Sequence, residues 1–369
     1  MAMAGPLHRL RRSPPHELRS QGGAGAIDRP AKAPLPHRPV SQPSLDIVAI
    51  GDAIVDVIAT CDDAFLVEHD LPRGGMQLLD TAAADRLYAA MGNARETSGG
   101  SAANSMAGIA AMGGTAAFIG QVADDQLGEI FRHDMRALGV RFDTPALANA
   151  GEHPTGRCLI LVTPDAQRTM NTCPGASHQL DVAALDEGLI RSASITFLEG
   201  YLWGPERPRE AMLHAARIAH DAGRCVAFTL SESLCIPGRK EGVMGMIDGG
   251  MIDMLFANED EVRHLTGCGD FEQCLAALAP KVATLVVTQG AAGATALEAG
   301  DRVEVPAATV EQVVDTTGAG DLFAAGFLAA RCRGHDLRKC LETGAIAAAE
   351  IISHFGARPE ADLKTLVRL

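Results

Sequence analysis

The stretch that decides the fold of this chain is Val313-Val-Asp-Thr-Thr-Gly-Ala-Gly-Asp-Leu-Phe-Ala-Ala-Gly-Phe-Leu-Ala-Ala330. The β-branched pair Val313–Val314 predicts the end of a short strand, and the Asp and Thr residues that follow are typical of a helix start. Phe323, Phe327 and Ala330 are spaced i, i+4 and i+7, so one stripe of the following helix can be buried. The stretch therefore predicts a strand end, a glycine-rich turn and a buried helix.

The turn predicts an anion site with an acid beside it. The first N–H groups of a helix have no partners inside the helix, and the helix dipole places partial positive charge there. Gly318 and Gly320 have no side chains that would block an anion from these N–H groups. Asp321 would repel a bound phosphate, unless the site holds a hydroxyl to be deprotonated on one side and a phosphoryl group on the other. The alternative is an ordinary capped helix whose small residues allow close packing.

The run Asp315-Thr-Thr-Gly-Ala-Gly-Asp321 is more specific than a bare Gly-x-Gly, and it closely resembles the second signature of the PfkB (ribokinase and adenosine kinase) family of carbohydrate kinases. The chain contains no Gly-x4-Gly-Lys-Ser/Thr loop and no Gly-x-Gly-x-x-Gly after a strand. The resemblance covers residues 45–369. It implies that Asp321 is the general base and that the N–H groups of Gly318, Ala319 and Gly320 form an anion hole.

Composition limits the possible partners and compartments. The 369 residues carry a net charge of -14, which argues against a nucleic-acid partner. Nine cysteines are scattered without a Cys-x-x-Cys pair, so reduced thiols in a cytoplasmic protein are expected rather than a disulfide framework. No apolar run approaches the roughly 18 residues of a membrane helix. We therefore expect no membrane association.

Residues 1–44 differ in composition from the rest of the chain. They hold 8 of the 19 prolines, and seven Arg or Lys residues against two acids. A segment of this kind cannot bury enough apolar surface to order itself, so we expect a disordered tail. An organellar transit peptide or an over-long assigned start would have the same composition. A secretory signal is not expected, because no apolar stretch follows the basic residues.

Leu45-Asp-Ile-Val-Ala-Ile-Gly51 predicts a buried strand with Asp52 and Asp56 at its carboxyl end, where open α/β sheets bind ligands. It resembles the first strand of PfkB kinases, and the resemblance implies that the acid at Asp56 grips sugar hydroxyls. Ser98-Gly-Gly-Ser-Ala-Ala-Asn-Ser105 resembles the first PfkB signature. It implies Gly100 and Asn104 as further contacts to the substrate, although tight helix packing would also explain its small residues.

After residue 115 the predicted strands and helices alternate, which indicates a mainly parallel sheet covered on both faces. Two regions break this rhythm, about 57–80 and 150–172, and both predict short strands. The fold class that follows is α/β: a ribokinase-like three-layer αβα domain over residues 45–369, with a small β-sheet lid. The lid assignment rests mainly on the resemblance, since a hairpin without function would show the same pattern.

Two motifs predict a nucleotide and a metal. Asn258-Glu-Asp-Glu261 follows an apolar strand, and an acidic first helix turn would explain it. Its Asn-x-x-Glu spacing matches the family's metal motif, which implies that Asn258 and Glu261 bind Mg²⁺, through water. Val286-Val-Thr-Gln-Gly-Ala-Ala-Gly293 resembles the family's ATP loop. The implied ATP-binding residues are Thr288, Gly290, Gly293 and Thr316.

The sequence is therefore interpreted as an ATP-dependent kinase for the primary hydroxyl of a nucleoside or sugar. The segments Arg168–Ser177 and Phe197–Trp203 look most like bacterial adenosine kinases or unassigned sugar kinases. Adenosine, converted to AMP, is the first expectation, and a free sugar such as ribose or fructose is the second. A catalytically silent ligand-binding protein on the same fold is a third reading, but its mark, an altered base or anion hole, is missing. The resemblance implies ATP and Mg²⁺, admits a monovalent cation such as K⁺, and leaves open a monomer or a homodimer through the lid.

Overall fold

The computed structural model describes residues 43–369 except 149–150, 166 and 232–238, and nearly all of the expected tail lies outside these residues. In the described part of the chain, nine strands form the main sheet in the order β14-β13-β12-β11-β10-β9-β1-β5-β6. These strands are β1 (Leu45–Ile50), β5 (Ala116–Ile119), β6 (Val140–Arg141), β9 (Ala193–Glu199), β10 (Cys225–Thr229), β11 (Met254–Asn258), β12 (Thr284–Thr288), β13 (Ala294–Glu298) and β14 (Asp301–Val305). All pairings are parallel except those that β13 makes with β12 and β14, which confirms the mainly parallel sheet.

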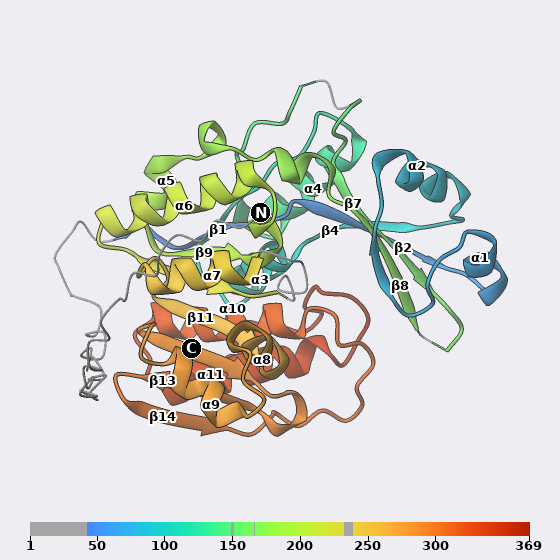
Figure 1. The fold of residues 1–369 in the computed structure, drawn as a ribbon. Helices are drawn as coiled ribbons and strands as arrows, with labels where there is room; N and C mark the ends of the chain where they lie inside the picture. Colours follow the sequence, from blue (N-terminus) through green and yellow to red (C-terminus); the bar gives the residue numbers. More distant parts are fainter. Residues whose placement is uncertain (1–42, 149–150, 166, 232–238) are drawn as a thin grey trace, which may run out of the picture. The chain divides into compact units, whose positions relative to one another are not determined.

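Helices cover both faces of the main sheet because its strands are apolar on both sides (Figure 1). In β1, Ile47 and Ala49 join one hydrophobic cluster, whereas Val48 and Ile50 join the other, as the two-residue period of a strand requires. The first cluster is completed by α3 (Ser101–Ala111), α4 (Gln126–Ala137), α10 (Ala319–Cys332), α11 (Leu337–Ile351) and α12 (Leu363–Val367). The second is completed by α5 (Glu187–Ser192), α6 (Glu206–Asp221), α7 (Arg239–Asp248), α8 (Glu259–Thr266) and α9 (Phe271–Leu278). The three-layer αβα arrangement is thus confirmed.

A second sheet has the order β3-β8-β7-β2-β4 and carries the short helices α1 and α2 (Figure 1). Its elements are β2 (Ile54–Thr60), α1 (Asp63–Glu68), β3 (Met76–Leu78), α2 (Thr81–Ala90), β4 (Arg95–Gly99), β7 (Gly156–Val162) and β8 (Arg168–Cys173). All strands except β4 overlap the ranges expected for a lid. β4 pairs antiparallel with β2 through its backbone, and its polar sequence gave no strand signal.

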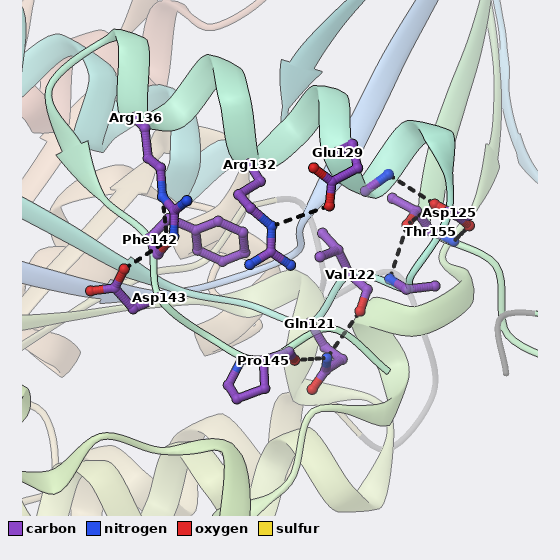
Figure 2. A network of polar contacts seen from close by, with 12 residues as sticks. Gln121, Val122, Asp125, Glu129, Arg132, Arg136, Phe142, Asp143, Pro145 and Thr155 are labelled. Atoms are coloured by element: carbon purple, nitrogen blue, oxygen red, sulfur yellow. Dashed lines mark hydrogen bonds and ion pairs between the residues drawn. The ribbon is translucent and has the colours of Figure 1, made fainter. Parts of the chain in front are cut away.

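A polar network at the start of α4 fixes the chain where it enters the second sheet (Figure 2). Asp125 caps α4 by accepting from the N–H of Gly128 at 2.8 Å. The same carboxylate accepts from the N–H and the hydroxyl of Thr155, at 2.8 and 2.6 Å. Thr155 directly precedes β7, so one side chain positions both a helix of the main domain and a strand of the second sheet.

The strand expected to end at Val313–Val314 is absent from the structure. β14 ends at Val305, and the chain then crosses to α11, where the N–H of Val314 donates to the carbonyl of Ile352 at 2.8 Å. The β-branched pair therefore lies in an irregular segment, because its backbone is satisfied by a helix end rather than by a strand. The helix after it agrees with the prediction: α10 starts at Ala319, and Phe323, Phe327 and Ala330 are buried. No helix in the described part of the chain is long and apolar enough to cross a membrane.

Candidate active site

A cleft of about 640 Å³ runs between the carboxyl ends of the main strands and the second sheet. It brings together most of the residues expected from the sequence, although they are spread over more than 260 positions. Those lining it are Asp52, Asp56, Gly100, Asn104, Asn258, Glu261, Thr288, Thr316, Gly318, Ala319, Gly320 and Asp321. Gly290 and Gly293 are not among its lining residues. They shape the turn between β12 and β13, where Gly293 has a φ of 105°.

Asp321 lies in the first turn of α10 with both carboxylate oxygens engaged. One oxygen accepts from the hydroxyl of Ser101 at 2.6 Å, and the other accepts from the side-chain amide of Asn104 at 2.8 Å. Burial raises the pKa of Asp321, while these two hydrogen bonds and the Arg358 guanidinium act to lower it. Two donors from α3 therefore orient the carboxylate at the mouth of the glycine turn.

The glycine turn has room for a side chain at Gly320 and none at Gly318. Gly318 is the N-cap of α10 with a φ of 79°, and a Cβ there would lie 2.8 Å from that of Ala357. A Cβ on Gly320 would meet no atom within 4 Å. Asp315 does not cap the helix, contrary to the sequence expectation; its carboxylate accepts from the N–H and hydroxyl of Thr317, at 3.1 and 2.8 Å. It stabilises the turn before the helix, and no side chain caps the first N–H groups of α10. The N–H of Ala319 donates to the carbonyl of Thr316 at 3.2 Å, so this one of the three N–H groups expected in the anion hole already has a partner.

Two further acids lie where the chain passes from β1 into the second sheet: Asp52 between β1 and β2, and Asp56 on β2. Burial raises the pKa of Asp56 to about 6, although Arg358 and Arg168 lower it. Burial also raises the pKa of Asp52, whose Oδ1 is buried without a hydrogen-bond partner. An unpartnered buried acceptor that lines a cleft is suited to a hydroxyl or N–H donor of a ligand.

Glu199, at the end of β9, ties the two substrate-facing segments together. Its carboxylate accepts from the N–H of Asp52 at 2.7 Å and from the N–H of Ala102 at 2.6 Å. The side chain is fully buried, and burial raises its pKa well above the ordinary value. Glu199 could not be recognised from the sequence, because a single acid at a strand end carries no pattern.

The second sheet contributes an apolar wall to the cleft. The wall consists of Ile54, Met76, Leu78, Cys158, Ile160 and Met170. Met76 and Leu78 are 52% and 60% exposed, which is unusual for two large apolar side chains on the same face of one strand. Exposed apolar surface inside a cleft favours a ligand with an apolar body.

Arg168 connects the second sheet to the turn before α10. Its guanidinium pairs with Asp315 at 2.6 Å and donates to the hydroxyl of Thr317 at 3.1 Å; the side chains of Arg168 and Asp315 are 11% and 6% exposed. The residue belongs to β8, whereas its partners lie about 150 positions later in the chain. A movement of the second sheet away from the main sheet must therefore break this ion pair or move the turn before α10 along with the sheet.

Asn258 and Glu261 form a reciprocal capping box at the start of α8. The side chain of Asn258 accepts from the N–H of Glu261, and the side chain of Glu261 accepts from the N–H of Asn258, both at 2.8 Å. In the described ranges no group of three or more His, Cys, Asp or Glu residues is arranged to hold a metal ion. This donor set fits Mg²⁺, which binds through one or two carboxylates together with water and phosphate oxygens.

A second cleft, also of about 640 Å³, lies on the other side of the turn. It is lined by residues 308–312 and Val314, by the α11 residues Ile346, Ala349 and Glu350, and by Ser353 just after that helix. Ile346 and Ala349 belong to the run Ala345-Ile-Ala-Ala-Ala349 of α11, in which four of the five residues are alanine. Val314 lines this cleft and Thr316 lines the first, so the turn separates the two.

The profile of the pfkB family carbohydrate kinases matches residues 44–364. The solved adenosine kinase of Sinorhizobium meliloti is 45% identical, with a TM-score of 0.81, over 88% of this chain and 98% of that one. A probable sugar kinase of Rhizobium etli CFN 42 is 41% identical, with a TM-score of 0.82, over 89% and 98%. The ATP-dependent ribose-1-phosphate kinase of Halopiger xanaduensis is 31% identical over 76% of this chain and 92% of its own length.

Proposed function

The chain belongs to the pfkB family of carbohydrate kinases, and on this basis we propose that it transfers a phosphoryl group from ATP to the primary hydroxyl of a nucleoside, adenosine being the first candidate. As a member of this family it is a phosphotransferase with an alcohol group as acceptor. The kinases of the family use ATP and Mg²⁺. What the proposal adds is the acceptor and the roles of the residues.

The apolar wall is the observation that supports a nucleoside. Asp56 and Asn104 at one end of the cleft suit hydroxyl groups, because a carboxylate accepts hydrogen bonds from a diol and a side-chain amide can both donate and accept them. Met76 and Leu78 face a much less polar partner, and a purine ring would cover them. A free sugar offers hydroxyls to both ends of the cleft. The 45% identity to an adenosine kinase agrees with the nucleoside.

The proposed reaction starts at Asp321. Its carboxylate takes the proton of the acceptor hydroxyl as that oxygen attacks the γ-phosphorus of ATP, and the bond from this phosphorus to the bridging oxygen breaks to release ADP. Ser101 and Asn104 keep the carboxylate aimed at the cleft. The N–H groups of Gly318, Ala319 and Gly320 stabilise charge on the transferring group, an effect worth about 10²–10³ in rate per donor in comparable sites. Asn258 and Glu261 would hold Mg²⁺, directly or through water, and the ion would neutralise charge on the nucleotide phosphates.

The nucleotide is assigned to the far side of the turn. The second cleft offers the small residues Ala308 and Ala349 to a purine ring, and the turn at Thr316 leads from it to Asp321. Thr288, Gly290 and Gly293 stay in the proposal as contacts to the phosphates and ribose of ATP. The second sheet acts as a lid over the acceptor, and a monovalent cation such as K⁺ is an optional activator.

The test is phosphotransfer from ATP to adenosine, ribose, fructose and ribose 1-phosphate, with each acceptor assayed with and without KCl. We expect adenosine to have the highest kcat/KM, with AMP as product. A free-sugar kinase is the second candidate, because the likeness to a probable sugar kinase is almost as strong. Phosphorylation of ribose or fructose with no turnover of adenosine would replace the first candidate with the second.

A further inference from the structure

Arg358 is a half-buried cation directly behind the proposed active site. It lies between α11 and α12 and is not a lining residue of the cleft, whereas its partner Asn104 is. Its guanidinium donates to the side-chain oxygen of Asn104, to the carbonyl of Ser98 at 2.7 Å and to the hydroxyl of Ser98 at 3.0 Å. One side chain near the carboxyl end of the chain thus holds both β4 and α3, about 255 positions earlier.

These contacts decide which way the Asn104 amide points. A guanidinium can only donate hydrogen bonds, so the atom of Asn104 that faces Arg358 must be its oxygen. The amide nitrogen is then turned toward Asp321, to which it donates at 2.8 Å. With the amide reversed, its oxygen would face the Asp321 carboxylate, acceptor against acceptor, and its nitrogen would face the Arg358 guanidinium, donor against donor. Arg358 therefore sets the donor that orients the proposed general base.

The same guanidinium interacts electrostatically with three acids around it. Asp56 on β2, Asp321 on α10 and Asp134 on α4 all stabilise its charge against burial. Arg358 in turn acts to lower the pKa of both Asp56 and Asp321. Of the other charged groups facing these acids, Arg168 on β8 also lowers the pKa of Asp56, and Glu199 on β9 interacts with Asp321 through a like charge.

We propose that Arg358 is a positioning residue of this kinase: it orients Asn104 toward Asp321 and places a positive charge beside Asp321 and Asp56. The proposal rests on the phosphotransfer proposed above. Asp321 can accept a proton only as a carboxylate, so activity rises as the pH passes through its pKa. Loss of Arg358 raises that pKa and moves the acid limb of the pH–rate profile to higher pH.

Three substitutions separate the charge from the hydrogen bonds. Arg358→Met removes both, Arg358→Gln keeps a donor for Asn104 without charge, and Arg358→Lys keeps the charge without the fork. We expect the acid limb of kcat to move up by about 1–3 pH units in the Met and Gln variants, the usual effect of one close opposite charge, and to stay in place in the Lys variant. The Met variant also loses about tenfold in kcat at high pH, as for one lost hydrogen bond.

Arg333→Met is the matched control. Arg333 donates to the backbone carbonyls of Ala329 and Met112 at 3.0 Å each. It thereby joins the carboxyl ends of α10 and α3, whereas Asp321 lies at the amino-terminal end of α10. Its removal should lower stability without moving the acid limb. An unchanged acid limb in Arg358→Gln, or an equal shift in Arg333→Met, would overturn the proposal.

A second readout does not depend on activity. Carboxylate ¹³C signals of labelled aspartate, assigned with Asp56→Asn and Asp321→Asn, report the two pKa values directly. In Arg358→Gln both should rise, and unchanged values refute the proposal even if no acceptor has been found. An enzyme that phosphorylates no acceptor while both pKa values rise would refute the phosphotransfer proposal and leave the electrostatic role of Arg358 intact. If the Met variant does not fold, the Gln and Lys variants decide the matter.

Discussion

At the scale of single residues, Asp321 is the most direct test of the proposed chemistry. Asparagine keeps the size of the side chain and can still bond to Ser101, but it cannot take a proton. We expect Asp321→Asn to lower kcat by about 10²–10⁴, with KM little changed, because the proton is shared only as the hydroxyl attacks. Steady-state kinetics on the true acceptor checks this. Near-normal turnover would exclude Asp321 as the base.

Gly320→Ala tests the anion hole separately from the base. A Cβ at this position meets no protein atom within 4 Å, so the fold should tolerate it. It would stand where a phosphate oxygen approaches the first turn of α10, and we expect weaker nucleotide binding as well as slower chemistry. Gly318→Ala is unsuitable as a probe, because its Cβ would clash with Ala357. Measuring KM for ATP in both variants separates the two roles: it should rise in Gly320→Ala and not in Asp321→Asn.

We expect the Asp56 carboxylate to lower the stability of the folded state while it strengthens binding of the acceptor. Burial raises its pKa from 3.8 to about 6, so the unfolded chain releases this proton at lower pH than the folded one. The folded state is therefore penalised as pH rises from about 4 to 6, by about 3 kcal/mol in the limit of a fully expressed shift. We expect Asp56→Asn to raise the melting temperature at pH 8 and not at pH 4, while KM for the acceptor increases. A variant less stable than the parent at pH 8 would show that the charge contributes more through Arg358 than it loses through burial.

At the scale of elements, α10 is held by helix contacts so close that only glycine fits. A Cβ on Gly326 would lie 2.6 Å from the carbonyl oxygen of Thr343 and 2.8 Å from the Cα of Gly344 on α11. Backbone cannot move aside as a side chain can, so Gly326→Ala should cost about 1–3 kcal/mol. Gly245→Ala on α7 is the control, since its Cβ meets nothing within 4 Å and alanine is the better helix former. Chemical denaturation should show the first variant destabilised and the second not.

The elements also show what the sequence could and could not predict. Strands such as β1, β9 and β12 were predictable because their apolar runs are buried on both faces. β4, Arg95-Glu-Thr-Ser-Gly99, was not, because its pairing with β2 uses backbone groups that any sequence supplies. The motif residues around Asp321 were predictable because the turn needs glycines at fixed positions. Arg358 was not, because its contacts with Ser98 and Asn104 depend on the folded path of the whole chain.

At the scale of the whole molecule, the largely buried pair of Arg168 and Asp315 couples the second sheet to the turn before α10. Asp315 also accepts from the N–H groups of Thr317 and Gly356, so the pair fixes the glycine turn as well as the second sheet. Ordering of the turn and closure of the cleft should therefore occur together. A substrate-bound enzyme that keeps this contact excludes water from the phosphoryl group.

Arg168→Met should uncouple the two sheets. Removing one partner of a buried pair typically costs about 3–5 kcal/mol, and here the cost falls on the closed arrangement of the cleft. We expect kcat/KM for the acceptor to fall by more than tenfold, and the share of ATP lost to water to rise, since a loosened second sheet admits solvent. Parallel assays of AMP and phosphate release measure that share. Arg73→Met, in the connection between α1 and β3, is the control, because its pairs with Asp63 and Asp165 are exposed and such pairs contribute little. If Arg168→Met lowers the melting temperature while AMP formation and water leakage stay at the parent's values, the pair stabilises the fold only and the coupling between sheet and turn must be abandoned.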